Sequence, residues 1–439
     1  MVPNEPPAPG PENSPTPVPA DKAGALAHLR VLDLTRILAG PWATQTLGDL
    51  GAEVIKIERP DTGDDTRSWG PPYLSGTELS AYFLCTNRNK RSVAIDIAQP
   101  DGAALLRRLA LESDVLVENF KVGGLKQYGL DYEALKAVHP GLIFCSITGF
   151  GQTGPEANRP GYDAMIQAVG GLMSITGRAQ GEPGDGPQKV GVAIADIMTG
   201  LYATIAILAA LEHRARTGEG QYIDISLFDV QVACLANQAL NFLATGEPPG
   251  RLGNAHPSIV PYQDFPTADG YLMIAVGNDA QFGRMCRALE RPEWACDARF
   301  SSNQARVEHR DVLVAKISDV TGQHLTQWSL RRLEAAGVPC GAVNSIADVF
   351  AGAQARARGL AIEMRSDAQR VPLVASPLRL SRSAVSYRHI PPRLGADTYA
   401  VLQSLLRLTE HELGALARRG IVQGDSSQCA DQHNPSRLS

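Results

Sequence analysis

The chain has no excess of positive charge. Its 41 lysine and arginine residues are outnumbered by 46 aspartate and glutamate residues, which gives a formal net charge of −5 and a pI of about 6.0. A protein without a positive field does not attract nucleic acid or an anionic membrane surface by long-range electrostatics. We therefore expect no nucleic-acid partner and no membrane partner, and any polyanionic ligand must be met by a local cluster of cations.

Metal and disulfide patterns are also missing. The seven cysteines are scattered, odd in number and form no C-x-x-C pair, which predicts reduced thiols in a cytoplasmic protein. The nine histidines form no H-E-x-x-H motif and no Cys/His group with zinc spacing. We expect no bound metal and no permanently bound cofactor.

Nucleotide and hydrolase motifs are absent or incomplete. The sequence has no Walker A lysine motif and no G-x-S-x-G nucleophile elbow. A G-x-G-x-x-G sequence does occur at 149–154, directly after a predicted strand. Pro155 and Pro160 follow it, however, where a dinucleotide fingerprint needs a helix. We interpret 149–154 as a Gly-rich loop that brings backbone close to a ligand, and not as an NAD site.

The chain has one long apolar run. It extends from Ile197 to Leu211, is short for a bilayer and contains Gly200, which predicts a buried helix. The Pro-rich segment 1–24 has neither the apolar core of a secretory signal nor the Arg-rich composition of a transit peptide. We predict disorder for 1–24 and for the polar tail 423–439.

Short β-rich runs alternate with helical patterns through the first half of the chain. Runs at 30–35, 53–58, 92–96, 115–118 and 142–148 are separated by helical patterns such as 42–50 and 101–112. Strands joined by helical crossovers predict a parallel sheet with helices on its faces. The expected fold class is therefore α/β, with a doubly wound large domain and a second, smaller domain after a Gly/Pro-rich break at 246–257.

An acid interrupts the apolar sequence in the middle of the chain. Asp196 stands between VGVAIA (190–195) and the apolar run that begins at Ile197. A structural interpretation is that Asp196 caps the helix, where its carboxylate would accept backbone N–H bonds. A catalytic interpretation is that a helix start keeps the carboxylate anionic, as a nucleophile requires. Considered alone, the local sequence favours the cap.

Cations cluster in the first third of the chain, several of them just beyond predicted strand ends. A parallel sheet places its ligand crevice at the carboxyl ends of its strands. Each cation alone is typical of a solvated surface, but the group predicts a site for a phosphate-bearing ligand. Its members are Arg36, Lys56, Arg59, Arg67, Arg88, Lys90, Arg91, Lys121 and Lys126.

An ordered set of motifs resembles the class III coenzyme A (CoA) transferases, the family of formyl-CoA transferase and of crotonobetainyl-CoA:carnitine CoA-transferase. The resemblance spans about residues 28 to 422. It is carried by VLDLT (31–35), AGP (39–41), GAEVIKIE (51–58), NKRS (89–92), VENF (117–120), GFGQTGP (149–155), GYD (161–163), AD (195–196), TGEGQ (217–221), GVPCG (337–341) and LG (394–395). Around 254–262 and 277–278 the chain resembles most the succinyl-CoA:glutarate branch and related dicarboxylate transferases.

The resemblance implies an architecture. It implies an interlocked homodimer, in which each ring-like chain is threaded through the other, with a Rossmann-like large domain. We expect a large CoA-binding domain at 25–228, a linker and small domain at 229–351, and a C-terminal return to the large domain at 352–422. The acyl-CoA thioester is then a substrate.

The resemblance also assigns site residues. Asp196 matches the nucleophilic aspartate of the family, which reverses the interpretation as a cap, and Tyr162 and Asp163 match a pair beside it. The residues implied for CoA binding are Arg36, Leu38, Arg59, Lys90, Asn119 and Lys126. Formyl-CoA transferase has a cation where this chain has Gln127 and an all-glycine loop around 253–256.

The implied reaction suits a carboxylate. Attack on an acyl-CoA would give a mixed anhydride and then an aspartyl-CoA thioester, and the acceptor acid would reverse these steps without ATP or metal. Backbone N–H groups at Gly151 or Gly253 are candidates to stabilise oxyanions. A dicarboxylate acceptor needs a cation for its free end, and His256 is a candidate, although a loop histidine before proline is equally often a structural hydrogen-bonder.

Two other functions compete with CoA transfer. A racemase of the α-methylacyl-CoA type shares the fold but removes an α-proton, and we expect a histidine before the aspartate in that branch, where this chain has Tyr162. A non-catalytic CoA-binding protein would explain the cations but gives no reason for Asp196. We expect a transferase that moves CoA from an acyl-CoA, with succinyl-CoA the favoured donor, to a carboxylic acid, with a dicarboxylate favoured.

Overall fold

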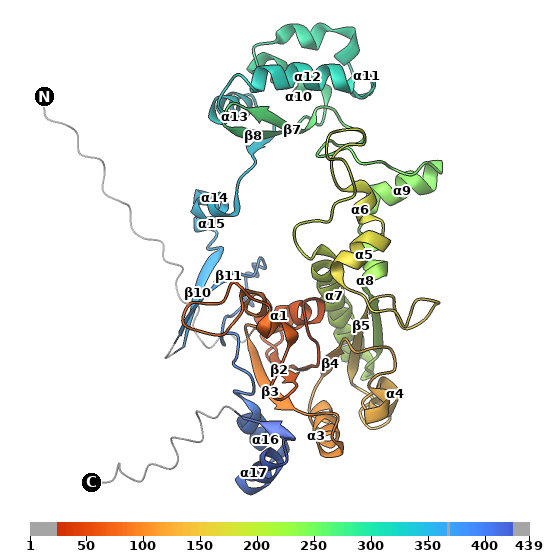
Figure 1. Cartoon of the computed structure of the whole chain (residues 1–439), viewed down its shortest axis with the longest axis vertical. Coiled ribbons are helices and arrows are strands. Elements are labelled where there is room, and N and C mark those ends of the chain that lie inside the picture. Colours follow the sequence, from red (N-terminus) through yellow and green to blue (C-terminus); the bar gives the residue numbers. More distant parts are fainter. Residues whose placement is uncertain (1–23, 367–368, 425–439) are drawn as a thin grey trace, which may run out of the picture. The chain divides into compact units, whose positions relative to one another are not determined.

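The computed structural model describes residues 24–366 and 369–424 (Figure 1). The segments for which the sequence predicts disorder lie outside the described residues, except at their inner edges. One of these edges is ordered, because Gln423 pairs with Ala94 in a strand.

A seven-stranded sheet organises the first half of the chain and receives its last strand from the C-terminal part. The neighbours β1–β2, β2–β3, β1–β4 and β4–β5 are parallel, and β12 is antiparallel to β3. The order β12-β3-β2-β1-β4-β5-β6 confirms the predicted α/β class with a mostly parallel sheet. The strands are β1 (Arg30–Asp33), β2 (Glu53–Glu58), β3 (Lys90–Ile95), β4 (Val115–Glu118), β5 (Ile143–Thr148), β6 (Tyr222–Ser226) and β12 (Val422–Gln423).

Helices pack against this sheet because their apolar residues recur at helical spacing. In α3 the buried Leu105, Leu106 and Leu109 join a core that also contains Leu32, Ile55 and other strand residues. Pro100 occupies the first turn of α3, where its missing N–H costs nothing. The helices of this part include α1 (Ala39–Asp49), α2 (Ala81–Leu84), α3 (Pro100–Leu111), α4 (Tyr132–Lys136), α16 (Thr398–Leu406) and α17 (Glu410–Arg418).

The chain forms two compact units. Unit 1 comprises the chain up to Ile147, Gly200–Asp224 and the chain from Ile362 onward, and unit 2 comprises Thr148–Thr199 and Ile225–Ala361. The sequence-based division placed 148–199 in the large domain, whereas these residues cluster with unit 2. The chain passes between the units within β5, within α7 (Ile194–Thr217), within β6 and within β10 (Ala361–Ser366), so a boundary drawn at a loop misses all four crossings.

Unit 2 has its own sheet and core. The antiparallel strands β7 (Tyr262–Thr267), β8 (Gly270–Ala275) and β9 (Cys340–Ala342) pair in that order, and Phe265, Leu272 and Ile274 are buried among helical residues. The helices that contribute are α10 (Asp279–Ala288), α11 (Asn303–Glu308), α12 (Arg310–Thr321) and α13 (Thr326–Ala335). Unit 2 also contains α5 (Asp163–Val169), α6 (Leu172–Ile175), α8 (Leu227–Ala233), α9 (Ala236–Thr245), α14 (Ile346–Ala351) and α15 (Ala353–Ala357).

Helix α7 begins at Ile194, three residues before the apolar run that predicts it. It has 24 residues and, within the described part of the chain, it is the one helix with the length and apolar composition to cross a membrane. The sequence predicts a buried helix, and Ala203, Ile207 and Ala210 are indeed buried. The opposite face is not, because Ile205 is 60% exposed and Leu201, Tyr202 and Leu208 are exposed as well. An exposed apolar face of this size is typical of a surface that another protein segment covers.

Candidate active site

A close contact between two glycines shapes the loop after β5. A Cβ atom on Gly149 would lie 2.6 Å from Cα of Gly161, and a Cβ atom on Gly161 would lie 2.3 Å from Cα of Gly149. Side chains at these positions would therefore push the two backbones apart. The chain accordingly folds back on itself between Gly149 and Gly161, and Tyr162 and Asp163 follow at the start of α5. The predicted approach of this loop to a ligand stays a prediction.

Asp163 caps the helix that carries Asp196. The Oδ1 atom of Asp163 accepts the backbone N–H groups of Ala195 (2.8 Å) and Asp196 (3.4 Å), and Oδ2 accepts a bond of 2.7 Å from Gln167. The interpretation of Asp196 as the cap is therefore wrong, because α7 begins at Ile194 and its first N–H groups are satisfied by Asp163. Asp196 is the third residue of α7, whereas a capping residue would precede Ile194.

The carboxyl group of Asp196 does not stabilise the fold through any polar contact among the described residues. It makes no hydrogen bond or ion pair with the described residues, although Asp196 is only 8% exposed. Burial, with a smaller contribution from the charge of Asp163, raises the pKa of Asp196 to about 7. Burial thus opposes the anionic state that the helix start was expected to favour. A buried, unpaired carboxyl group with a pKa near neutrality is typical of a functional group.

Two loops meet at the point where the strand order of the large sheet reverses. Asn119, after β4, accepts the N–H of Arg36 (3.0 Å) and donates to the carbonyl oxygen of the same residue (2.8 Å), after β1. Next to Arg36, Ile37 has a φ of 75°, a conformation that a β-branched residue rarely adopts. Strain of this kind persists where the surroundings enforce it, and the switch point of a parallel sheet is a general ligand site.

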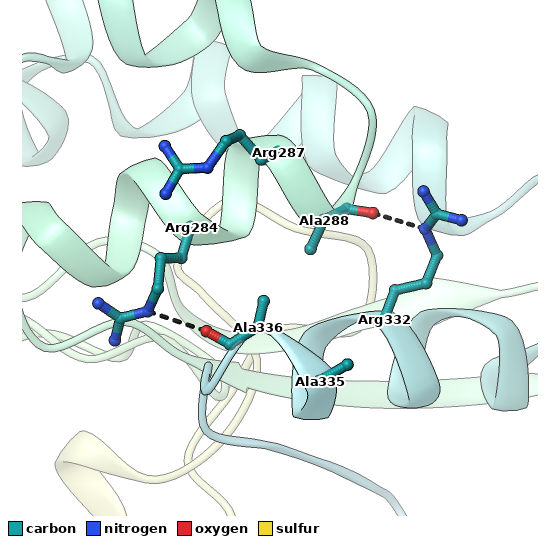
Figure 2. A pocket seen from close by; sticks show the side chains of 6 residues that line it. All are labelled: Arg284, Arg287, Ala288, Arg332, Ala335 and Ala336. Atoms are coloured by element: carbon teal, nitrogen blue, oxygen red, sulfur yellow. Dashed lines mark hydrogen bonds between the residues drawn. The ribbon is translucent and has the colours of Figure 1, made fainter.

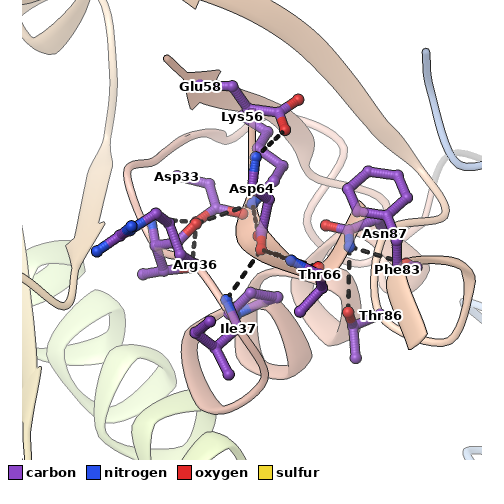
Figure 3. Close-up of polar contacts among 12 residues, drawn as sticks. Asp33, Arg36, Ile37, Lys56, Glu58, Asp64, Thr66, Phe83, Thr86 and Asn87 are labelled. Carbon is purple, nitrogen blue, oxygen red and sulfur yellow. Dashed lines mark hydrogen bonds and ion pairs between the residues drawn. The ribbon is translucent and has the colours of Figure 1, made fainter. Parts of the chain in front are cut away.

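A buried network of charges supports these loops from inside the sheet. Figure 3 shows Lys56 beside Asp64, with Nζ at 2.9 Å from Oδ2, and Asp64 also accepts the N–H of Ile37 at 3.3 Å. Nζ of Lys90 lies 2.9 Å from Oδ2 of Asp33 and 3.0 Å from the carbonyl oxygen of Pro41. Burial alone would raise the pKa of Asp33, but Lys90, Lys56 and two threonine hydroxyl groups lower it to about 2.

The other residues predicted for CoA binding differ in accessibility. Arg59, directly after β2, and Lys126 are exposed, and Arg36 is exposed and paired with Asp65 at 2.8 Å. Leu38 is 5% exposed and precedes α1, whereas Lys90 is 1% exposed and is engaged as described above. Lys90 thus belongs to the interior of unit 1, and its expected role in CoA binding stays a prediction.

The predicted oxyanion and carboxylate groups lie in unit 2. The N–H of Gly151 donates to Oγ1 of Thr148 at 3.0 Å, so it is not available to an oxyanion in this conformation. Gly253 lies in an exposed turn with a φ of 59°. Nδ1 of His256 accepts the N–H of Ser258 at 3.0 Å, which supports the structural interpretation of this histidine and leaves the proton on Nε2.

A cavity of about 460 Å³ in unit 2 contains none of the predicted residues (Figure 2). Nε of Arg284, on α10, donates to the carbonyl oxygen of Ala336 beyond the end of α13, and Nε of Arg332, on α13, donates to that of Ala288 at the end of α10. Each helix thus supplies the cation that satisfies the end of the other. We assign this cavity a structural role.

The structure brings together two pairs of the predicted residues, one pair in each unit. Asp163 and Asp196 are joined in unit 2, and Arg36 and Asn119 are joined in unit 1. The cap at Asp163, the strained Ile37 and the buried ion pairs were not predicted from the sequence. A signal existed for the ion pairs, because Lys56 stands inside the apolar strand sequence 54–57 and a buried lysine needs a partner.

Taken together, these features define an α/β protein with two hydrogen-bonded loops at the switch point of its sheet and a buried carboxyl group suited to nucleophilic chemistry. The chain belongs to CoA-transferase family III, whose model matches residues 26–398.

Relatives and solved structures agree with this family. The chain is 49% identical to a succinate–glutarate CoA-transferase of Agrobacterium fabrum, over 87% of this chain and 95% of the relative. It is 45% identical to a human succinyl-CoA:glutarate CoA-transferase, over 90% of each chain. The crystal structure of a CAIB/BAIF family protein from Brucella suis superposes with a TM-score of 0.78 at 51% identity, covering 87% of this chain and all 100% of that one. The chain is thus a CoA-transferase, and the predicted class of enzyme is confirmed.

Proposed function

We propose that the protein moves CoA from succinyl-CoA to glutarate or a related dicarboxylate through its Asp196 carboxylate. The observation that carries this proposal is Asp196 itself, which is buried, unpaired and held at the start of α7 by Asp163. The names of the two relatives above support the choice of donor and acceptor. No observation favours the racemase, because Tyr162 occupies the position where that branch is expected to have a histidine.

The mechanism balances without a metal or a net proton. A carboxylate oxygen of Asp196 attacks the thioester carbonyl of succinyl-CoA, and the C–S bond breaks to give a mixed anhydride and CoA thiolate. The thiolate then attacks the aspartyl carbonyl and releases succinate, which leaves an aspartyl-CoA thioester. The acceptor carboxylate repeats both steps in reverse and regenerates the aspartate. Each step exchanges one acyl bond for another, so the overall exchange is close to isoenergetic.

The test is a product assay. The protein is incubated with succinyl-CoA and a panel of mono- and dicarboxylates, and new CoA esters are identified by mass. We expect glutaryl-CoA and free succinate in equal amounts. Deuterium exchange at the α-carbon of a methylacyl-CoA without CoA transfer would instead identify a racemase, and the absence of any new ester would leave a CoA-binding protein.

Asp163 is expected to set the acid limit of the activity. Only the ionised form of Asp196 attacks, so the rate of CoA transfer by the wild type should decrease as the pH is lowered from 7. At pH 6 about one tenth of Asp196 is ionised. Asp163→Asn removes the neighbouring negative charge but keeps an oxygen to cap α7. Its kcat/KM profile should therefore move to lower pH. An unchanged profile would show that Asp163 acts on α7 alone.

Asn119 is expected to support binding of the CoA ester by holding the strained loop. Asn119→Ala loses both bonds to Arg36, and the KM for succinyl-CoA should rise about tenfold, since a left-handed Ile37 costs about 1–2 kcal/mol. Ile37→Gly in the same background removes this cost and should recover part of the affinity. If the double variant binds no better than Asn119→Ala, the loop conformation does not explain the effect.

We propose that the protein is a homodimer, interlocked as the family resemblance implies. Support comes from apolar surface that a single chain leaves uncovered. Helix α9 has no buried residue, and its Leu240 and Leu243 are 65% and 75% exposed. The exposed face of α7 adds Ile205 and its neighbours. Light scattering should give twice the chain mass, and Ile205→Glu should weaken that association.

A further inference from the structure

Unit 2 contains a cation whose hydrogen-bonding capacity is only partly used. Arg310 is the first residue of α12, and its Nη2 donates to the carbonyl oxygens of His256 (2.8 Å) and Pro257 (3.0 Å). The other terminal nitrogen, Nη1, is buried and has no hydrogen-bond partner within the described residues. A buried donor left unpaired costs about 1–3 kcal/mol, and more on a charged group. Nη1 therefore calls for an acceptor.

The position of Arg310 on its helix is also unfavourable for a cation. The N-terminus of α12 carries a partial positive charge that repels a guanidinium group. Burial lowers the pKa of Arg310, and the neighbouring Asp311 offsets this in part. Guanidinium donors and a helix start both favour an anion, so a bound carboxylate would relieve the repulsion and satisfy Nη1 together.

The loop beside Arg310 does not need Nη1 for its own stability. Asn303 donates to the carbonyl oxygen of Ser258 (2.9 Å) and accepts the N–H of Val260 (3.2 Å), and Arg306 donates to the carbonyl oxygen of Val260 (2.8 Å). With Nη2 of Arg310 on His256 and Pro257, residues 256–260 are anchored at four positions. Nη1 is thus surplus to the anchoring.

A second orphaned nitrogen lies in the same segment. Nε of Arg251 is buried and, in the part of the chain that the structure describes, lacks a hydrogen-bond partner. Arg251 precedes Gly253 and His256 in the Gly/Pro-rich loop. The side chain of Arg251 lies against Gly177, so its Nε is a separate unsatisfied donor of unit 2.

We propose that Nη1 of Arg310 binds the free carboxylate of the dicarboxylate substrates, so that Arg310 determines the preference for dicarboxylates. The inference rests on the proposed function, in which the acceptor and succinyl-CoA both carry a carboxylate that does not react. A carboxylate taken out of water needs a paired cation, and Nη1 offers it two N–H donors on a charged group. The same subsite serves both halves of the exchange, because the donor and the acceptor occupy it in turn.

The test compares substrates that differ only in the free carboxylate. Glutarate is compared with valerate as acceptor, and succinyl-CoA with butyryl-CoA as donor. Arg310→Gln loses the charge but can still donate to the loop. We expect its ratio of kcat/KM for glutarate over valerate to fall about 10- to 100-fold, with valerate little affected. Arg310→Lys, which keeps the charge, should give an intermediate ratio and provides a second measurement if Arg310→Gln folds poorly.

The controls distinguish a carboxylate-binding Arg310 from one that only anchors the loop or contacts a partner chain. Arg284→Gln removes an arginine of unit 2 that caps α13, and it should leave the ratio unchanged. If Arg310→Gln lowers kcat/KM for glutarate and valerate equally, Arg310 only anchors the loop and the inference is wrong. It is also wrong if the variant dissociates into monomers with an unchanged ratio, since the acceptor for Nη1 would then belong to a partner chain. If the wild type forms no glutaryl-CoA at all, the proposed function itself fails.

Discussion

Asp196→Asn should abolish CoA transfer and at the same time make the folded protein more stable at pH 8. The amide has the shape of the carboxyl group but cannot form an anhydride, so kcat should fall by about 10⁴-fold or more. Hydroxylamine added during turnover should label the peptide that contains Asp196 in the wild type and not in the variant. Retained transfer in the variant would exclude the proposed mechanism.

The gain in stability follows from the raised pKa of Asp196. A carboxyl group whose pKa is 3.8 in the unfolded chain and about 7 in the folded one opposes folding at any pH where the unfolded form is ionised. The cost begins near pH 3.8, grows to about pH 7 and is constant above it, at about 4 kcal/mol for a shift of this size. Asp196→Asn should therefore raise the urea midpoint markedly at pH 8 and much less at pH 5.

An exposed aspartate provides the comparison. Asp319 lies on the surface of α12. The variant Asp319→Asn removes the same charge and should change the urea midpoint little at either pH. If Asp196→Asn also left the midpoint unchanged at pH 8, the pKa of Asp196 would not be raised in the folded protein. The same residue thus links activity and stability, as expected where a site trades stability for reactivity.

The sheet could be predicted from the sequence because its signals are local. Strands buried on both faces appear as short apolar runs, and helical segments between such runs predict that the strands pair in parallel. Five of the seven strands, β1 to β5, were predicted in this way. The seventh, β12, was missed because it has two residues and pairs with β3 across more than three hundred positions of sequence. Such pairing leaves no local pattern.

The candidate site could be predicted only in part, for a physical reason. The identity of Asp196 was accessible through its neighbours in sequence and the family resemblance. Its pKa was not, because a helix start lowers the pKa of a carboxyl group and burial raises it, and only the fold decides which effect is larger. The cap was misassigned for a similar reason, since the oxygen that satisfies α7 comes from Asp163, far away in sequence.

The basic residues of the first third show the same limit. The sequence gathered them into one cationic surface, whereas Lys56 and Lys90 are fully enclosed with Asp64 and Asp33. The end of a predicted strand indicates where a residue lies in the sheet. It does not indicate whether the charged group of that residue is exposed to solvent or paired in the interior. Arg59 and Lys126 remain exposed and keep the expected role as a proposal.

Lys90→Met distinguishes a structural lysine from one that binds CoA. Methionine fills a similar volume but leaves Asp33, which is buried, without its closest cation, so we expect a loss of about 3–5 kcal/mol in the free energy of unfolding at pH 7. Because Lys90 helps to keep the pKa of Asp33 near 2, this loss should shrink as the pH falls toward 3 and Asp33 of the variant takes up a proton.

The paired variant decides between the two roles of Lys90. Lys90→Met with Asp33→Asn removes both charges and should recover most of the lost stability, since a neutral pair has no uncompensated charge to bury. If Lys90 serves the fold, this double variant should also bind succinyl-CoA with a KM close to that of the wild type. If instead stability is unchanged in Lys90→Met while the KM rises, the ammonium group of Lys90 reaches the ligand, and the ion pair with Asp33 must open when CoA binds.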